Sequence, residues 1–145
     1  MGELVSQTNA KSQTVSMTYD KLGRLIQRNE IEGQTTWTYD AGNKAIGKLT
    51  TVTQYGGYSR SNTYDDLGRP NSTTTVIGGT SYTTSTSYDG FGRADEITYP
   101  SLFKVRNIYN NFGYLEQVRN GNNTCLLYTS PSPRDLSTSR MPSSA

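Results

Sequence analysis

Pairs of tyrosine and aspartate recur along the chain, and their side chains could contact a ligand. A tyrosine ring can stack on a sugar or a cation, and a carboxylate can bind a cation. The pairs are Tyr19-Asp20, Tyr39-Asp40, Tyr64-Asp65 and Tyr88-Asp89, with Tyr109-Asn110 as a variant. Successive tyrosines are about 20 to 25 residues apart, a period typical of repeat proteins. We therefore expect a repeated structural element to position each pair.

Other catalytic chemistry has little support in the sequence. The chain contains no histidine, which excludes Ser-His-Asp and Cys-His catalysis and histidine metal sites. Asp95 and Glu96 are adjacent, and adjacent strand residues point to opposite faces. Residues 42–48 resemble a phosphate-binding loop, but Leu49 stands where Ser or Thr is needed and a strand-like segment follows. We expect no enzymatic activity, no cofactor, and no catalytic or metal site.

The residues around each pair predict a β-hairpin. In residues 14–19, Val, Met and Tyr alternate with Thr and Ser, which is the period of a strand. The motif Asp-x-x-Gly follows, with Asp20 and Gly23 in the first copy. Aspartate can accept hydrogen bonds from the backbone of a type I turn, and glycine can adopt a positive φ. Each copy therefore predicts a strand, a four-residue hairpin loop and a second strand.

The repeated residues allow two interpretations. They could form a row of ligand-contacting aromatic rings and carboxylates, or the tyrosines could pack against neighbouring copies while the aspartates hold the turns. We favour the second, because the spacing follows the turn. The residues assigned to this structural motif are Tyr19, Asp20, Gly23, Arg24, Tyr39, Asp40, Tyr64, Asp65, Gly68, Arg69, Tyr88, Asp89, Gly92, Arg93, Tyr109, Asn110 and Gly113.

The repeated hexapeptide resembles the YD repeat of Rhs proteins, which also occurs in insecticidal toxin complexes, bacterial wall-associated proteins and teneurins. The copies are Tyr19-Asp20-Lys21-Leu22-Gly23-Arg24, Tyr64-Asp65-Asp66-Leu67-Gly68-Arg69 and Tyr88-Asp89-Gly90-Phe91-Gly92-Arg93, with variants at residues 39–44 and 109–114. The resemblance covers about residues 14–120. The departures are Gly42, which comes one residue early, Asn110 in place of Asp, and Tyr114 in place of Arg.

The resemblance implies a function. YD repeats of bacterial members form a hollow β-shell around a toxic C-terminal domain, in secreted or contact-dependent toxins. Neighbouring repeats and an enclosed effector of the same parent chain would then be the partners, and the location would be outside the cell or at its surface. The alternative is a carbohydrate-binding or cell-surface adhesion module, as in wall-associated or teneurin-like proteins, with glycans as partners. The self-cleaving Asp-Pro-x-Gly motif of some Rhs shells does not occur in this sequence.

The predicted fold is all-β, with tandem hairpins side by side in a curved antiparallel sheet, because a lone hairpin is marginally stable. We expect hairpins at residues 14–31, 34–55, 58–77, 80–99 and 102–119. Residues 1–13 would be a partial repeat or a frayed start, and residues 14–124 the repeat array. With 32% hydrophobic residues, such a sheet would bury one modest face rather than a thick core.

Charge and hydropathy narrow the possible partners. The chain has 145 residues, 14 of them basic and 12 acidic, and its net charge of +2 is too balanced to favour binding to nucleic acid or an anionic membrane. No apolar run approaches the roughly 18 residues that a membrane-spanning helix needs. The first residues lack the features of a signal peptide. We expect the chain to be a piece of a longer protein, so this absence does not locate it.

The last 21 residues differ in composition from the repeats, since serine and proline replace the alternating pattern after Thr124. Residues 125–145 resemble the in-frame translation of a transposase-type sequencing adapter. We therefore expect a non-native, disordered tail. Cys125, the only cysteine, would then carry no information about the redox environment of the protein.

Overall fold

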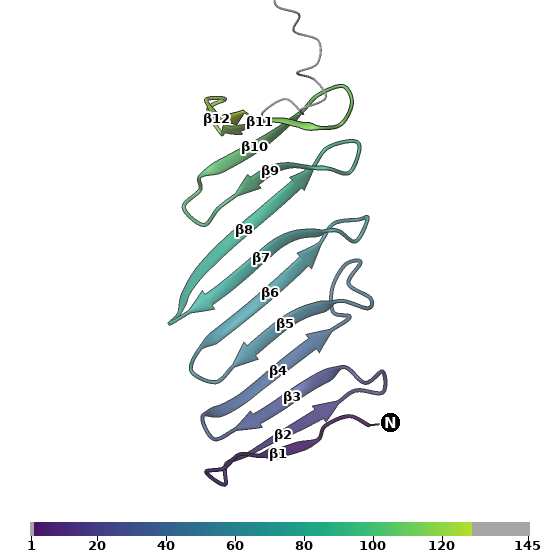
Figure 1. Ribbon diagram of the computed structural model, residues 1–145, viewed down its shortest axis with the longest axis vertical. Coiled ribbons are helices and arrows are strands. Elements are labelled where there is room, and N and C mark those ends of the chain that lie inside the picture. The colour runs from purple at the N-terminus through teal and green to yellow at the C-terminus, as the bar shows by residue number, and fades with distance from the viewer. Residues whose placement is uncertain (1, 129–145) are drawn as a thin grey trace, which may run out of the picture.

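The structure is a computed structural model that describes residues 2–128, and these residues form one open, curved antiparallel sheet (Figure 1). Its strands follow one another in chain order, so every strand pairs with its sequence neighbours. The strands are β1 (Ser6–Thr8), β2 (Thr14–Tyr19), β3 (Leu25–Glu30), β4 (Gly33–Tyr39), β5 (Leu49–Gln54), β6 (Tyr58–Tyr64), β7 (Pro70–Ile77), β8 (Thr80–Tyr88), β9 (Ala94–Thr98), β10 (Lys104–Tyr109), β11 (Leu115–Asn120) and β12 (Cys125–Tyr128). The predicted all-β fold is confirmed.

The connections lie along the two long sides of the sheet, where the strands end, and we call each of these sides an edge. The loops that follow the motif tyrosines, at residues 20–24, 40–48, 65–69, 89–93 and 110–114, lie along one edge, on the right in Figure 1. We call it the motif edge. The connections between copies lie along the other edge, which we call the opposite edge. At each motif tyrosine the strand pairing shifts register by one residue, a β-bulge that increases local twist.

The chain segments before and after the repeat array also join the sheet. Within residues 1–13, β1 pairs with β2. Residues 125–128 form β12, paired with β11, so the expected disorder does not hold for these four residues. An unpaired strand edge can accept any extended segment, which explains why a sequence without the repeat pattern pairs there. The remainder of the predicted tail, residues 129–145, lies outside the described residues.

The two faces of the sheet differ in chemistry because directly paired residues share a face. One row across β4 to β8 contains Trp37, Val52, Arg60, Thr75 and Tyr82. Tyr39 lies two residues beyond Trp37, and Tyr64 lies four residues beyond Arg60. Because strand residues an even number of positions apart share a face, these motif tyrosines lie on the same face as the row. The neighbouring row on the other face is Thr38, Thr51, Ser61, Thr74 and Thr83. The sheet therefore has a mixed aromatic face and a hydroxyl-rich face.

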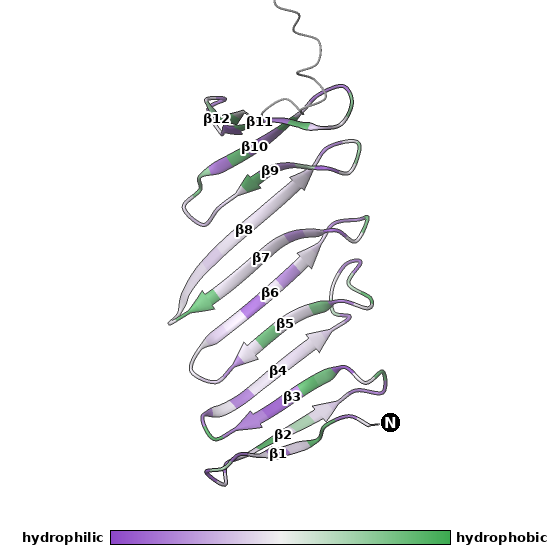
Figure 2. Ribbon diagram, viewed as in Figure 1, coloured by the Kyte–Doolittle hydropathy of each residue, from purple (hydrophilic) through white to green (hydrophobic). Residues whose placement is uncertain are grey.

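The described residues form almost no core. Ala45 and Thr50 are the only two of them that are buried, and Thr50 donates its hydroxyl to the Thr38 carbonyl at 2.9 Å. The ribbon is mostly pale or purple, with only short apolar stretches (Figure 2). Backbone ladders and contacts between copies must therefore provide cohesion that a hydrophobic core provides in most domains. Within residues 2–128 no helix has the length and apolarity needed to cross a membrane.

Candidate functional site

The motif turn is held by its aspartate. In the copy that begins at Tyr64, Asp65 N donates to the Arg69 carbonyl at 2.9 Å, and Gly68 N donates to the Asp65 carbonyl at 2.8 Å. Asp65 Oδ1 accepts the N–H groups of Leu67 and Arg69, at 3.0 and 2.8 Å. Asp20 and Asp89 make the same set of bonds in their own turns. The aspartate side chain thus closes the loop that joins two strands of one copy.

The arginine that ends the motif pairs with the same aspartate. Arg69 lies 2.7 Å from Asp65 Oδ2, and Arg93 and Asp89 repeat this ion pair at 2.7 Å. Partial burial raises the pKa of the Asp65 carboxyl, but hydrogen bonds from the Arg69 backbone and side chain outweigh it and leave that pKa below its usual value. Asp65 therefore stays ionised at neutral pH, which keeps the arginine side chain oriented along the sheet.

Each motif cation also contacts the tyrosine of the next copy. The Arg69 guanidinium lies 4.0 Å from the centroid of the Tyr88 ring, and the Arg93 guanidinium lies 4.2 Å from that of Tyr109. The remaining contacts of this kind join Arg24 to Tyr39 at 4.4 Å and Lys48 to Tyr64 at 4.6 Å. These are cation–π distances. Four forward links therefore connect five successive motif copies, and we call this series the cation–tyrosine ladder.

The tyrosine hydroxyls strengthen the same connection. Tyr64 donates to the Leu49 carbonyl at 2.7 Å, and Tyr88 donates to the Pro70 carbonyl at 2.6 Å. Tyr109 donates to the Ala94 carbonyl at 2.9 Å. In each case the acceptor directly follows the cation that lies over the ring. A tyrosine is thus held at its ring by one residue of the preceding copy and at its hydroxyl by the next residue.

The motif glycine leaves room for the incoming cation. Gly92 has a φ of 83°, and a Cβ added there would lie 3.3 Å from Arg69 Nη1. A Cβ on Gly113 would lie 3.4 Å from Arg93 Nη1, and one on Gly68 would overlap Lys48 Nζ. Lys48 Nζ also donates to the Gly68 carbonyl. Glycine is therefore needed here both for its positive φ and for the absence of a side chain.

The second copy differs from the sequence-based alignment, in which Gly42 and Lys44 end the motif. The structure instead places Gly47 and Lys48 in those positions. Asp40 N donates to the Lys48 carbonyl at 3.0 Å, as in the other turns, and Gly47 has a φ of 79°. The loop is longer because four residues are inserted. The sequence contained this signal, since Gly47-Lys48-Leu49 matches Gly23-Arg24-Leu25.

Asp40 shows how the longer loop keeps the ionic network. Arg24 Nη2 lies 2.6 Å from Asp40 Oδ2 and Arg24 Nε lies 2.7 Å from Asp20 Oδ2, so one guanidinium joins two copies. The hydrogen bond from Arg24 lowers the pKa of the Asp40 carboxyl, with a further contribution from Gly47 N. Asp40 and then Asp20 raise the pKa of Arg24. The first link of the ladder is therefore both ionic and aromatic.

The fifth copy keeps the turn but not the forward link. Asn110 Oδ1 accepts the N–H groups of Phe112 and Tyr114, each at 3.0 Å, so asparagine replaces aspartate in the turn. Tyr114 occupies the position of the motif cation and is 72% exposed. The ladder described here thus ends at Tyr109.

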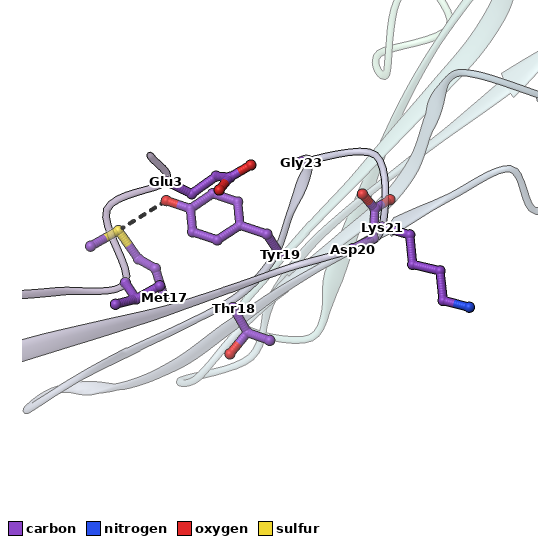
Figure 3. A pocket seen from close by; sticks show the side chains of 8 residues that line it. Glu3, Met17, Thr18, Tyr19, Asp20, Lys21 and Gly23 are labelled. Atoms are coloured by element: carbon purple, nitrogen blue, oxygen red, sulfur yellow. Dashed lines mark hydrogen bonds between the residues drawn. The ribbon is translucent and has the colours of Figure 1, made fainter. Parts of the chain in front are cut away.

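Residues 2–4 occupy the place of the end of a further copy, within residues 1–13, where the sequence predicts a partial repeat or a frayed start. Tyr19 donates its hydroxyl to the Leu4 carbonyl at 2.9 Å, as Tyr64 does to Leu49. Glu3 takes the place of the motif cation, because a Cβ on Gly23 would lie 3.1 Å from Glu3 Oε1. Glu3, Tyr19 and Gly23 are among the residues that line a hollow of about 380 Å³ (Figure 3). A carboxylate cannot form the favourable contact with the ring that the later cations form.

The remaining candidate groups are engaged in structural contacts. Asp95 pairs with Arg106 at 3.1 Å, and Glu96 pairs with Lys104 at 2.8 Å. The loop at residues 40–48 leads into β5, whereas a phosphate-binding loop leads into a helix. Within the described residues, no three His, Cys, Asp or Glu side chains form a group that could hold a metal ion. The best-defined arrangement of side chains is therefore the cation–tyrosine ladder, which links one copy to the next.

Comparisons with solved structures support this fold. The chain is similar to TcdB2-TccC3-Cdc42, with a TM-score of 0.55, 24% sequence identity and 74% of this chain covered. It is also similar to TcdB2-TccC3 without the hypervariable C-terminal region, with a TM-score of 0.53, 24% identity and 75% coverage. A third likeness is to the Tc holotoxin pore of Photorhabdus luminescens with a mutation in TccC3, with a TM-score of 0.52, 25% identity and 75% coverage.

These likenesses concern a small part of large proteins. The matched region covers 5% of the length of each of the three chains. No protein-family model and no curated protein sequence matches this chain. The comparisons therefore support a fold of the Rhs/YD-repeat kind, which agrees with the sequence motif.

Proposed function

We propose that the chain is a non-catalytic piece of the wall of an Rhs/YD-repeat shell, which encloses a C-terminal toxin domain of the same parent protein. The observation that carries the proposal is the cation–tyrosine ladder, in which four successive steps join the cation of one copy to the tyrosine ring of the next. At the steps to Tyr88 and Tyr109 a hydroxyl hydrogen bond and an ion-paired turn add to the ring contact. Such links extend a sheet by addition, which is what a wall built from one continuous chain requires.

The near absence of a core agrees with this role. A sheet that buries only Ala45 and Thr50 among its described residues is poorly suited to act alone as a globular domain. It would be stabilised where other parts of the parent chain cover its surfaces. The likeness to toxin-complex structures is consistent with a toxin shell, and the secreted or cell-surface location belongs to the proposal.

The test uses the parent gene and protein. Sequencing outward from codon 124 is expected to reveal more Tyr-Asp-x-x-Gly-Arg copies, then a self-cleavage motif and an unrelated terminal domain. In the purified parent protein, that terminal domain should resist protease until the shell is opened. Repeats that lead instead into a wall or membrane anchor without an effector would contradict the proposal.

A carbohydrate-binding or adhesion module is the second candidate. It is favoured by exposed tyrosines away from the ladder, since Tyr55 is 75% exposed and Tyr82 is 46% exposed. The rings of Tyr39, Tyr64 and Tyr88 are already contacted by cations. Glycan-array binding that is lost in a Tyr55→Ala, Tyr82→Ala variant would support this candidate, and an array without binding would oppose it.

A further inference from the structure

In every copy, the motif edge carries an exposed large apolar side chain at the same position of the loop. Each lies directly before the motif glycine, at the tip of the loop. The residues and their exposed fractions are Leu22 at 76%, Ile46 at 87%, Leu67 at 78%, Phe91 at 86% and Phe112 at 86%. Successive loops on one edge are two strands apart, or about 10 Å. The five side chains therefore form a regular row along the edge, which we call the apolar row.

The turn itself does not require these residues. Three connections on the opposite edge, at residues 9–13, 99–103 and 120–124, close with the same pair of backbone hydrogen bonds as the motif turns. The residues equivalent to Leu67 are Lys11, Ser101 and Asn122 in these turns. An identical turn thus accepts polar residues on one edge and carries leucine or phenylalanine on the other. The apolar row therefore indicates a contact surface rather than a demand of the local backbone.

The opposite edge has apolar side chains of its own, at other positions of its connections. They are Ile31 at 71% exposed, Tyr55 at 75%, Ile77 at 57% and Leu102 at 80%. At least one lies in, or directly before, each of four successive connections, since Ile77 is the last residue of β7, so this second row has the same two-strand period as the apolar row. Two rows with equal period can interdigitate along their whole length when one sheet lies beside another.

We propose that the motif edge docks on the opposite edge of a second run of the same repeat sheet, which for the isolated chain is a second copy. The proposal rests on the proposed wall function in one respect: in a shell wall, neighbouring runs of the sheet would lie side by side and form one surface. Nine side chains meet in this arrangement and would bury roughly 900 Å² of apolar surface. A stable interface buries about 1,200–2,000 Å² in total, so two short chains should associate weakly.

This contact is heterologous, because different edges of the two copies meet. A heterologous contact leaves one free edge on each partner, so association can continue beyond a pair. An isologous contact between two motif edges would stop at a dimer. The heterologous and isologous arrangements can therefore be distinguished by the size of the assemblies. They can also be distinguished by whether two variants, each altered at a different edge, associate when they are mixed.

The test is sedimentation of the full chain over a range of concentrations. One variant carries Leu67→Ser and Phe91→Asn, which copy the residues of the opposite-edge turns. A second carries Ile31→Thr and Leu102→Asn, and asparagine suits the positive φ of 64° at residue 102. Tyr82→Thr, on the face of the sheet, is the matched control. We expect the wild type and the control to associate, each edge variant alone to remain monomeric, and an equal mixture of the edge variants to form pairs.

Other outcomes would overturn the proposal. If the second variant still dimerises and the mixture forms nothing new, two motif edges contact each other. If both edge variants associate like the wild type, the free backbones of β1 or β12 are responsible. A wild-type chain that stays monomeric at every concentration would also contradict it. Each of these results leaves encapsulation to be decided on the parent protein, so the two proposals can fail separately.

Discussion

The Arg69 guanidinium lies 4.0 Å from the centroid of the Tyr88 ring, although the two residues belong to different hairpins. Arg69 is at the same time tied to Asp65 of its own turn. One side chain therefore holds a loop closed and joins it to the next repeat. Because the contact between a cation and the next tyrosine ring recurs at each of four steps, the hexapeptide spacing reflects contacts between copies as well as the turn within each copy.

Gly68→Ala is expected to destabilise the fold more than Gly79→Ala. Both glycines have a similar positive φ, 75° and 80°, so both substitutions strain the backbone by about 1–2 kcal/mol. Only at Gly68 would the new Cβ meet Lys48 Nζ, since nothing lies within 4 Å at Gly79. Urea denaturation measures the difference. If the two variants have equal stability, the glycine does not act as the space for the cation.

A further comparison isolates the close contact at Gly68. In a Lys48→Ala background the amine is absent, so the extra cost of Gly68→Ala over Gly79→Ala should disappear. An extra cost that persists without the lysine would assign the effect to the backbone alone.

Glu3→Arg is expected to raise the melting temperature. Glu3 occupies the position that a cation holds in later copies, beside the Tyr19 ring and Gly23. Arginine there could contact the ring as Arg69 contacts Tyr88, which would add a link to the ladder. Glu3→Gln removes the negative charge without adding a cation and is the control. A Glu3→Arg variant no more stable than Glu3→Gln would show that the hollow does not accommodate the side chain in this way.

Acid should destabilise the sheet over a defined range of pH. The pKa values of Asp20, Asp40, Asp65 and Asp89 are all lowered in the folded protein from an ordinary value of 3.8. The unfolded chain then binds more protons than the folded chain as pH falls, so the ionic contribution is present above about pH 4 and is lost as pH falls through the lower folded values. We expect nearly constant stability from pH 7 to about pH 5 and a decline below about pH 4.

Asp65→Asn tests the origin of this decline. Asn110 shows that asparagine accepts the same two backbone N–H groups, so the turn should be kept while the ion pair with Arg69 is lost. The variant should be less stable at pH 7, have a flatter decline in acid, and approach the wild type near pH 2. An unchanged pH profile would exclude Asp65 as a contributor.

The hairpins were predictable because turn and strand signals are local in sequence. Residues 14–19 alternate with period two, and Asp20 and Gly23 specify the turn, so strands β2 to β11 match the expected hairpins to within one residue. Contacts between hairpins are less accessible, because no local pattern specifies which ring Arg69 meets. The four-residue insertion before Gly47 was misread, because the motif was expected to have a fixed spacing. Glu3 was not recognised at the position of the motif cation, because it carries the opposite charge. The function of the chain as part of a toxin shell, which the sequence resemblance implies, remains a proposal.

The most direct test of the ladder is a double-mutant cycle between Arg69→Gln and Tyr88→Leu. Arg60→Gln is the control for lost charge, because the structure shows no ion pair or ring contact for Arg60 among the described residues. Urea denaturation gives the free energy of unfolding of the wild type, both single variants and the double variant. A link between copies predicts a favourable coupling of about 0.5–1 kcal/mol between Arg69 and Tyr88 and none between Arg60 and Tyr88. Strictly additive effects of Arg69→Gln and Tyr88→Leu would contradict the ladder as the connection that holds successive copies together.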